Sequence, residues 1–179
     1  KMARTLERLP HKDGISERFS IEDEMARLHV TAASVAVVAE GRVAWARAFG
    51  TKQASITDRV DINTLFLAGS ISKPVFATGL LALVEQRTIE LDTDVNGILK
   101  SWQLPASRFT EKEKVTLRRI LSHSAGLTVW GFPGYEVGTA VPTVPQLLDG
   151  APPANTPAVR NDTTPGARWL YSGGGITIA

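Results

Sequence analysis

The sequence predicts a mixed α/β protein of the α+β kind, in which an antiparallel β-hairpin is followed by helices. Residues 32–39 (AASVAVVA) form a short, valine-rich apolar run that is typical of a buried strand. Residues 43–49 alternate large side chains with alanines, and this period of two predicts the partner strand across a tight turn at Glu40-Gly41-Arg42. Residues 74–84 carry apolar side chains on nearly every face at helical spacing, which predicts a buried helix.

Composition places the chain among ordinary globular proteins. Its 179 residues are enough for one domain with a real core, and 43% of them are hydrophobic. The formal net charge of +2 is too small to imply a nucleic-acid or membrane partner, and no stretch approaches the length of a membrane span. The absence of cysteine excludes disulfides and thiolate metal sites, and it leaves the compartment open between the cytoplasm and export after processing.

The segments around the hairpin are predicted from apolar spacing and turn residues. Apolar side chains spaced through residues 15–28 are consistent with an amphipathic helix. The polar stretch 51–63 should be a loop. Residues 64–68 then indicate a short strand or an extended segment that leads into the following helix.

The second half of the chain contains shorter elements. Residues 95–102 are ambiguous, whereas Thr116 can cap a short helix over 117–122. The chain is rich in glycine and proline from residue 131 to 166, with a possible small helix at 142–148. So long an irregular region is unusual in a compact domain, and it suggests a wall that faces a substrate.

The first candidate for chemistry is the Ser-x-x-Lys sequence that begins at Ser70 and ends at Lys73. Residues three apart share a helix face, so the hydroxyl and the amine can meet. A serine needs a base to become a nucleophile, and burial together with the positive end of the helix dipole would lower the pKa of Lys73 and make it such a base. The alternative is structural: Ser70 or Ser72 caps the helix, and Lys73 extends to solvent.

Four segments of the chain occur in a specific order. They are the hairpin over 32–49, the Ser-x-x-Lys sequence, LSHSAGL at 121–127 and PGARWLYSGGG at 165–175. Together they resemble the serine β-lactamase-like family, which includes class C β-lactamases, D-alanyl-D-alanine peptidases, D-amino-acid amidases and related esterases. The resemblance runs from about Phe19 to Ala179. It implies an antiparallel sheet flanked by helices, with a mostly helical region inserted.

The resemblance implies roles for three side chains. Ser70 matches the nucleophile that becomes acylated, and Lys73 matches the lysine that helps to deprotonate it. Tyr171 matches the tyrosine that carries protons between the serine, the lysine and the leaving group. A nearby ammonium would lower the pKa of this tyrosine, and the two titrations would be coupled. Without the resemblance, Tyr171 would be interpreted as a core or interface aromatic beside Trp169.

The chain departs from the family pattern at two points. Gly173, at a substrate-binding position, replaces the asparagine of many members, which favours ester or simple amide substrates. No Lys-Thr-Gly or His-x-Gly segment follows Tyr171, although that strand supplies a second oxyanion donor in the family. We therefore expect residues 1–179 to be the N-terminal part of one catalytic domain. Residues 14–69 would supply a helix and the first strands of the sheet, and residues 70–179 would supply the nucleophile helix and the helical region that forms the cleft. A C-terminal polypeptide or continuation would complete the sheet, and residues 1–179 alone should be inactive and poorly soluble.

The sequence-based hypothesis is a serine hydrolase that forms an acyl-enzyme on Ser70 and acts on an ester, an amide or a lactam. We expect no cofactor and no metal, because the three histidines show no metal-ligand spacing. We interpret His123 as a structural, hydrogen-bonded histidine at a helix end. The alternative is a catalytically silent binding or scaffold protein on the same fold, which should not acquire a covalent label from a fluorophosphonate or a labelled penicillin.

Overall fold

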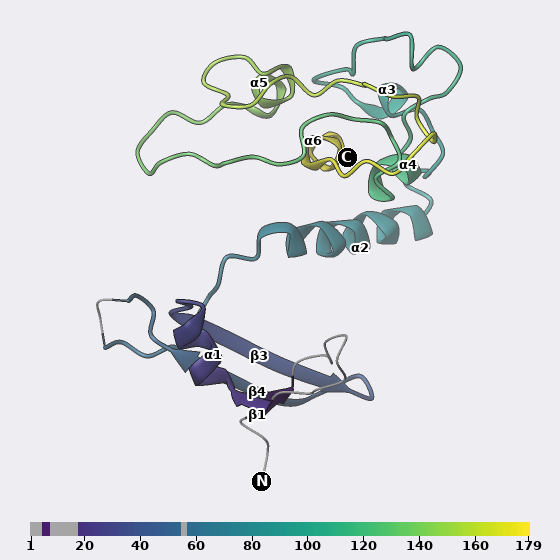
Figure 1. Ribbon diagram of the computed structural model, residues 1–179. Helices are drawn as coiled ribbons and strands as arrows, with labels where there is room; N and C mark the ends of the chain where they lie inside the picture. The colour runs from purple at the N-terminus through teal and green to yellow at the C-terminus, as the bar shows by residue number, and fades with distance from the viewer. Residues whose placement is uncertain (1–4, 8–17, 55–56) are drawn as a thin grey trace, which may run out of the picture. The chain divides into compact units, whose positions relative to one another are not determined.

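The structure is a computed structural model, and it describes residues 5–7, 18–54 and 57–179. The chain divides into two compact units, residues 1–67 and residues 68–179 (Figure 1). This boundary lies close to the predicted division between residues 69 and 70. The expectation that both parts belong to one catalytic domain stays a prediction.

The first unit opens with a small antiparallel pair, β1 (Thr5–Glu7) and β2 (Arg18–Ser20), followed by α1 (Ile21–Arg27). The helix predicted over 15–28 is therefore too long, since 18–20 is a strand and 15–17 lie outside the described residues. Ser20 explains where the helix begins: its hydroxyl accepts a hydrogen bond from the Asp23 N–H at 3.0 Å.

The predicted hairpin is confirmed as β3 (Ala32–Ala39) and β4 (Arg42–Gly50) (Figure 1). Glu40 and Gly41 link the strands with φ values of 51° and 72°, the left-handed geometry that suits a two-residue hairpin turn. Gly50 ends β4 at a φ of 86°, where a Cβ would lie 2.0 Å from the Thr31 carbonyl oxygen. Only glycine fits this end of the strand.

The expectation that 32–39 is a buried strand is wrong for the described chain. Val38 on β3 and Val43 on β4 each expose 64% of their surface. Among the described residues, β3 and β4 pair only with one another, and so do β1 and β2. The apolar side chains of these strands favour burial against another segment, but they do not identify the polypeptide that would bury them. That a polypeptide outside residues 1–179 completes the sheet stays a prediction.

The second unit opens with a 3₁₀ turn, η1 (Gly69–Ile71), which runs into α2 (Ser72–Glu85). The strand alternative for 64–68 is wrong, because these residues form no strand and Ala68 has right-handed helical dihedral angles. All-round burial of the helix is a wrong prediction for the described chain. Leu80 is the buried residue of α2, whereas Val75 exposes 69% of its surface. Apolar side chains encircle α2, yet the described residues of the second unit cover one side of it.

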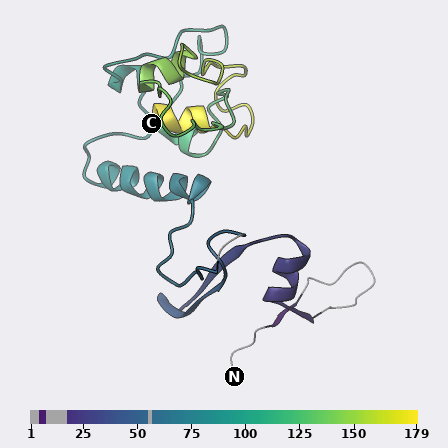
Figure 2. The same cartoon turned by 90° about the vertical axis from the view of Figure 1, so that its left-hand side faces the viewer.

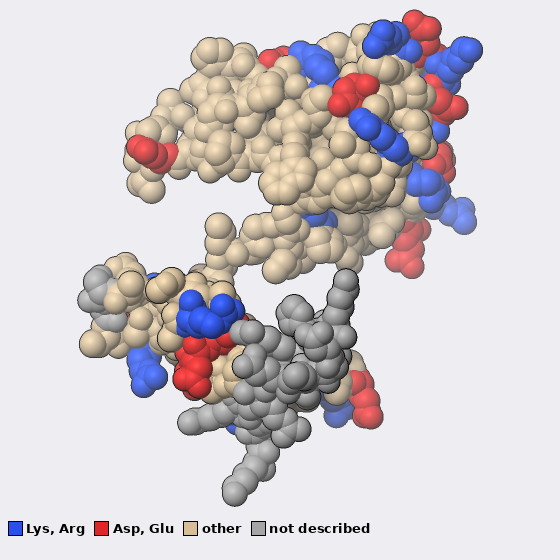
Figure 3. Space-filling view, in the orientation of Figure 1, with Lys and Arg blue, Asp and Glu red and all other residues tan. Residues whose placement is uncertain are grey.

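The rest of the second unit packs on that covered side of α2 (Figures 1 and 2). It contains α3 (Val95–Ile98), α4 (Leu117–Leu121), α5 (Val144–Asp149) and α6 (Gly173–Ile178). The predicted helices at 117–122 and 142–148 are confirmed with small shifts, and their caps are Thr116 and Thr143. In the space-filling view, charged side chains of this unit gather at the edge that holds α3 and α4, and most of the remaining face is uncharged (Figure 3).

The core of the second unit joins α2, α4 and α6 through apolar side chains. Ile120 and Leu127 are 1% exposed and Val159 is fully buried. Residues 167–171, which lead into α6, form no strand. Gly173 to Gly175 begin α6, and Ser172 caps this helix by accepting the Gly175 N–H at 2.8 Å.

Candidate active site

Ser70 occupies the middle of η1, and its hydroxyl oxygen is contacted from two directions. Lys73, one turn later, places Nζ 3.1 Å from Ser70 Oγ. Tyr171, which is 101 residues away along the chain, donates its hydroxyl to the same oxygen at 2.8 Å. The structure therefore brings the three predicted catalytic side chains together around one atom.

The structural alternative for the Ser-x-x-Lys sequence does not describe this arrangement. Neither η1 nor α2 has a side-chain hydrogen bond at its N-cap. Lys73 is half-buried and turns back toward Ser70, and its Nζ lies 5.1 Å from the centroid of the Tyr171 ring. The hydroxyl of Ser70 is thus engaged by a cation and a phenol, and the first turn of the helix is capped by neither serine.

Tyr171 is positioned by the segment that precedes α6. Its neighbour Ser172 is 3% exposed and donates its hydroxyl to the Thr128 carbonyl oxygen at 2.7 Å. The first N–H groups of α6 continue this attachment, because Gly173 donates to the Trp130 carbonyl oxygen at 3.0 Å. The start of α6 is therefore tied to residues 128–130, and this fixes the backbone from which the tyrosine extends.

The surroundings of Tyr171 favour its phenolate form. Hydrogen bonding by Lys73, and then by Ser70, lowers the pKa of the Tyr171 phenol from its ordinary value of 10.0. The positive charge of Lys73 acts in the same direction. With a lowered pKa, a larger fraction of Tyr171 is phenolate near neutral pH than in an ordinary tyrosine, and the phenolate is the form that accepts a proton.

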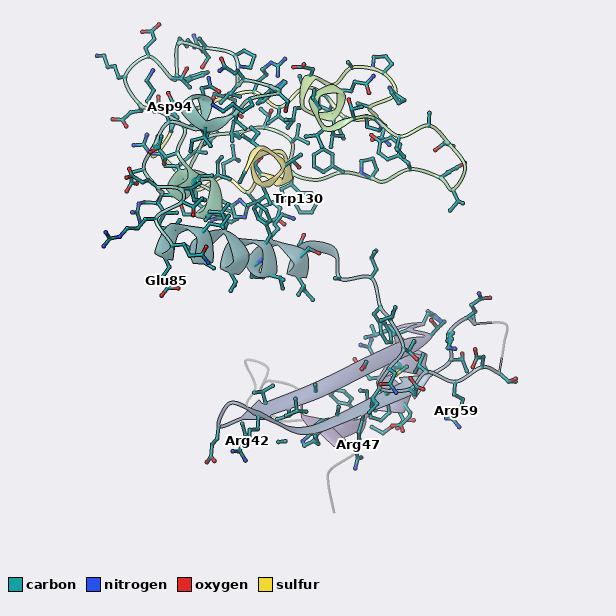
Figure 4. The ribbon with its side chains drawn as sticks, turned by 180° about the vertical axis from the view of Figure 1, so that it is seen from behind. Arg42, Arg47, Arg59, Glu85, Asp94 and Trp130 are labelled. Atoms are coloured by element: carbon teal, nitrogen blue, oxygen red, sulfur yellow. The ribbon has the colours of Figure 1, made fainter. Side chains whose placement is uncertain are left out.

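A cavity of about 600 Å³ opens beside Ser70. Its lining is largely aromatic and apolar, and Lys73 is the charged side chain among the described residues that line it. Trp130 forms part of this lining and lies next to α6 (Figure 4), with its ring centroid 5.5 Å from that of Tyr171. Sequence analysis did not single out Trp130. Its place in the irregular segment after LSHSAGL gave no periodic signal.

Gly173 also lines the cavity, and its close neighbours give a steric reason for the absence of a side chain. Asparagine at this position would be expected to supply an amide to the substrate. A Cβ at Gly173 would lie 2.9 Å from the Trp130 carbonyl oxygen and 3.3 Å from Gly131 Cα. Packing against residues 130–131 therefore requires glycine at this position. The same glycine leaves the cavity without a side-chain amide.

Replacing Gly173 with asparagine should destabilise the protein, because the new Cβ must push the backbone at residues 130–131 aside. We expect a loss of about 1–3 kcal/mol, the usual cost of overpacking. Thermal melting measures it, with Gly97→Asn as the matched control because its Cβ would meet nothing closer than 4.0 Å. Equal melting temperatures for the two variants would contradict this packing argument.

His123 lies against the site and is hydrogen-bonded, as the structural interpretation requires. Its Nδ1 accepts the Ser172 N–H at 3.3 Å, and its ring centroid lies 4.4 Å from that of Tyr171. The expectation of a histidine at a helix end is met, since α4 ends at Leu121. Its contact with Tyr171 spans residues 48 positions apart in sequence and could not be inferred from spacing.

Within the described chain no group of three or more His, Cys, Asp or Glu side chains could hold a metal ion. No helix in the described ranges is long and apolar enough to cross a membrane. Arg118 pairs with Asp92, and Arg119 pairs with Glu113. The two pairs tie α4 to the segments on either side of α3.

Comparison with known proteins agrees with the fold. The Beta-lactamase family model matches residues 20–179, and the chain belongs to this family. A curated relative, Esterase EstB of Burkholderia gladioli, is 29% identical over 112 residues, which are 62% of this chain and 28% of the relative.

Solved structures show the same fold. An octameric penicillin-binding protein homologue from Pyrococcus abyssi superposes with a TM-score of 0.62 at 22% identity, over 88% of this chain and 36% of that one. SurE in complex with D-Leu gives a TM-score of 0.58 at 22% identity, over 88% of this chain and 34% of that one. A putative 6-aminohexanoate-dimer hydrolase from Bacillus anthracis gives a TM-score of 0.53 at 15% identity, over 91% of this chain and 42% of that one.

The chain spans about a third of the length of these relatives, from 28% of the esterase to 42% of the hydrolase. The predicted fold class, a β-lactamase-like arrangement of antiparallel strands and helices, is confirmed by these likenesses.

Proposed function

We propose that this chain carries the nucleophile and the proton-transfer groups of a serine hydrolase that works through an acyl-enzyme on Ser70. The observation that carries the proposal is the convergence of Lys73 Nζ and Tyr171 OH on Ser70 Oγ, at 3.1 Å and 2.8 Å. A nucleophile within hydrogen-bond reach of its base is the arrangement that covalent catalysis needs. The name of the relative, an esterase, agrees with this class of reaction.

In the acylation step, the Tyr171 phenolate, supported by the Lys73 ammonium, takes the proton of the Ser70 hydroxyl. Ser70 Oγ then bonds to the substrate carbonyl carbon, and the carbonyl oxygen becomes an oxyanion that the Ser70 N–H helps to stabilise. When the bond to the leaving group breaks, Tyr171 returns the proton to the departing oxygen or nitrogen.

Deacylation reverses the roles. Water gives its proton to Tyr171 and its oxygen bonds to the acyl carbon. The bond to Ser70 Oγ breaks, and the serine regains a proton. The balance is one substrate and one water consumed, with one acid and one alcohol or amine released, and no cofactor or metal enters it.

The cavity favours ester or simple amide substrates with an apolar acyl group. Phe76, Trp130 and Phe132 supply aromatic surface beside the nucleophile. Gly173 offers no side-chain amide for a peptide or lactam carbonyl, and the packing against Trp130 excludes one. A small-molecule ester is therefore the substrate class that we propose.

Short-chain p-nitrophenyl esters should be turned over faster than the β-lactam reporter nitrocefin by the complete protein. The ratio of kcat/KM for the two substrates is the measurement. A clear preference for nitrocefin would contradict the substrate class, whereas turnover of neither, together with no covalent label at Ser70, would favour the silent binding protein.

A further inference from the structure

Both main-chain N–H groups that flank Tyr171 donate to His123. The Leu170 N–H donates to the His123 carbonyl oxygen at 2.7 Å, and the Ser172 N–H donates to His123 Nδ1 at 3.3 Å. The rings of His123 and Tyr171 lie together, with a centroid distance of 4.4 Å and a tilt of 34°. One residue thus contacts the backbone before the tyrosine, the backbone after it and its side chain.

His123 is itself held in a specific conformation. Its φ is 54°, in the left-handed region that non-glycine residues seldom occupy. Its N–H donates to the Ile120 carbonyl oxygen at 3.0 Å, which fixes the turn that ends α4. Trp169 packs edge-on against the histidine ring at 6.0 Å. The ring therefore has a defined place against Tyr171.

We propose that His123 is a positioning residue that holds the Tyr171 hydroxyl on Ser70, and that it does so as the neutral ring with its proton on Nε2. The role in turnover rests on the proposed function, because the position of Tyr171 matters to the reaction only if the tyrosine moves protons. The tautomer follows from the geometry alone: Nδ1 accepts the Ser172 N–H, so in the neutral ring it cannot carry the proton.

Protonation of His123 would turn Nδ1 from a hydrogen-bond acceptor into a donor, and the hydrogen bond from the Ser172 N–H would be lost. The charged groups that face the ring within the described chain are Lys73, from α2, and Tyr171. Burial, and then the charge of Lys73, lower the pKa of His123 from its usual 6.5. The acceptor on Nδ1 is present above this lowered pKa, and it is lost as the pH falls through it. In the unfolded chain His123 has its usual pKa and binds a proton more readily. The free energy of unfolding should therefore rise with pH between the lowered pKa and 6.5.

Two substitutions in the complete protein separate the acceptor from the ring. His123→Asn keeps an acceptor near Nδ1 and is tolerated at positive φ, but it loses the ring contact. His123→Phe keeps the ring against Tyr171 and loses the acceptor. We expect kcat for a p-nitrophenyl ester to fall on the order of 10-fold or more in His123→Phe, with KM little changed, and to recover in His123→Asn. Equal losses in the two variants, or a larger loss in His123→Asn, would overturn the proposal.

The pH profile adds a readout that a purely structural histidine would not move. The unmodified protein should lose kcat as His123 protonates, whereas His123→Asn should keep more of its own kcat at the same acidic pH. Identical acid limbs in the two proteins would count against the positioning role.

Nitrogen NMR of histidine-labelled protein gives a test that requires neither activity nor a folded variant. At a pH above 7 the His123 ring should show the Nε2–H tautomer. The Nδ1–H tautomer would overturn the proposal even in an active enzyme. An Nε2–H tautomer in a protein whose Ser70 never acquires a label would instead count against the proposed function.

Discussion

Replacing Ser70 with alanine should abolish covalent labelling of the complete protein by a fluorophosphonate or a labelled penicillin. Ser70 Oγ is the oxygen on which Lys73 Nζ and Tyr171 OH converge, and no other hydroxyl in the described part of the chain has both contacts. The serine is exposed and contributes little to packing, so the free energy of unfolding should change by less than about 1 kcal/mol. Intact mass before and after treatment measures the label, and thermal melting measures the fold.

Ser72→Ala is the matched control. Ser72 is also exposed and lines the same cavity two residues later, but it is the first residue of α2. We expect this variant to label normally. Loss of the label in Ser72→Ala, with retention in Ser70→Ala, would assign the nucleophile to Ser72 and would separate the Ser-x-x-Lys sequence from its proposed role.

Local patterns were sufficient to predict the elements that depend on neighbouring residues. The alternation over 43–49 and the glycine in the turn predicted β3 and β4, because a hairpin is formed by residues close in sequence. Thr116 predicted the start of α4 for the same reason, since a cap bonds a backbone N–H three residues later. Ser70 and Lys73 are likewise one helical turn apart, and helix geometry alone brings them into contact.

Features that depend on distant segments could not be predicted in this way. Glycine has low helix propensity, so local propensity disfavours a helix over Gly173 to Gly175. The structure forms a helix there because glycine alone allows the close approach to residues 127–131. The apolar side chains of α2 and β3 predicted that these elements are buried, but amino-acid composition does not specify which segment packs against them. His123 reaches Tyr171 through the path of the chain between them, which no spacing rule describes.

Replacing Tyr171 with phenylalanine should lower kcat/KM on the order of 10²-fold or more, as expected for a positioned acid–base group. Only the hydroxyl is removed, so the ring contacts with His123 and Trp130 remain. The melting temperature should therefore change little, and the loss should appear in turnover and in the rate of labelling at Ser70.

Tyr135→Phe is the control for the loss of a tyrosine hydroxyl. The Tyr135 hydroxyl accepts the Asn155 N–H at 3.3 Å, and Tyr135 does not line the cavity beside Ser70. This variant should turn over esters at a near-normal rate. Near-normal turnover in Tyr171→Phe would instead remove Tyr171 from the mechanism and leave Lys73 as the base.

The dependence of kcat/KM on pH provides the second readout for Tyr171. Because Lys73 and Ser70 lower the pKa of this phenol below 10.0, the rate should rise with pH and level off below pH 10 in the unmodified protein. The base is the deprotonated form, so the rate falls as the pH drops through the lowered pKa. Phenylalanine does not titrate, and this rise should be absent from Tyr171→Phe. A rise of the same size and midpoint in the variant would assign the titration to another group.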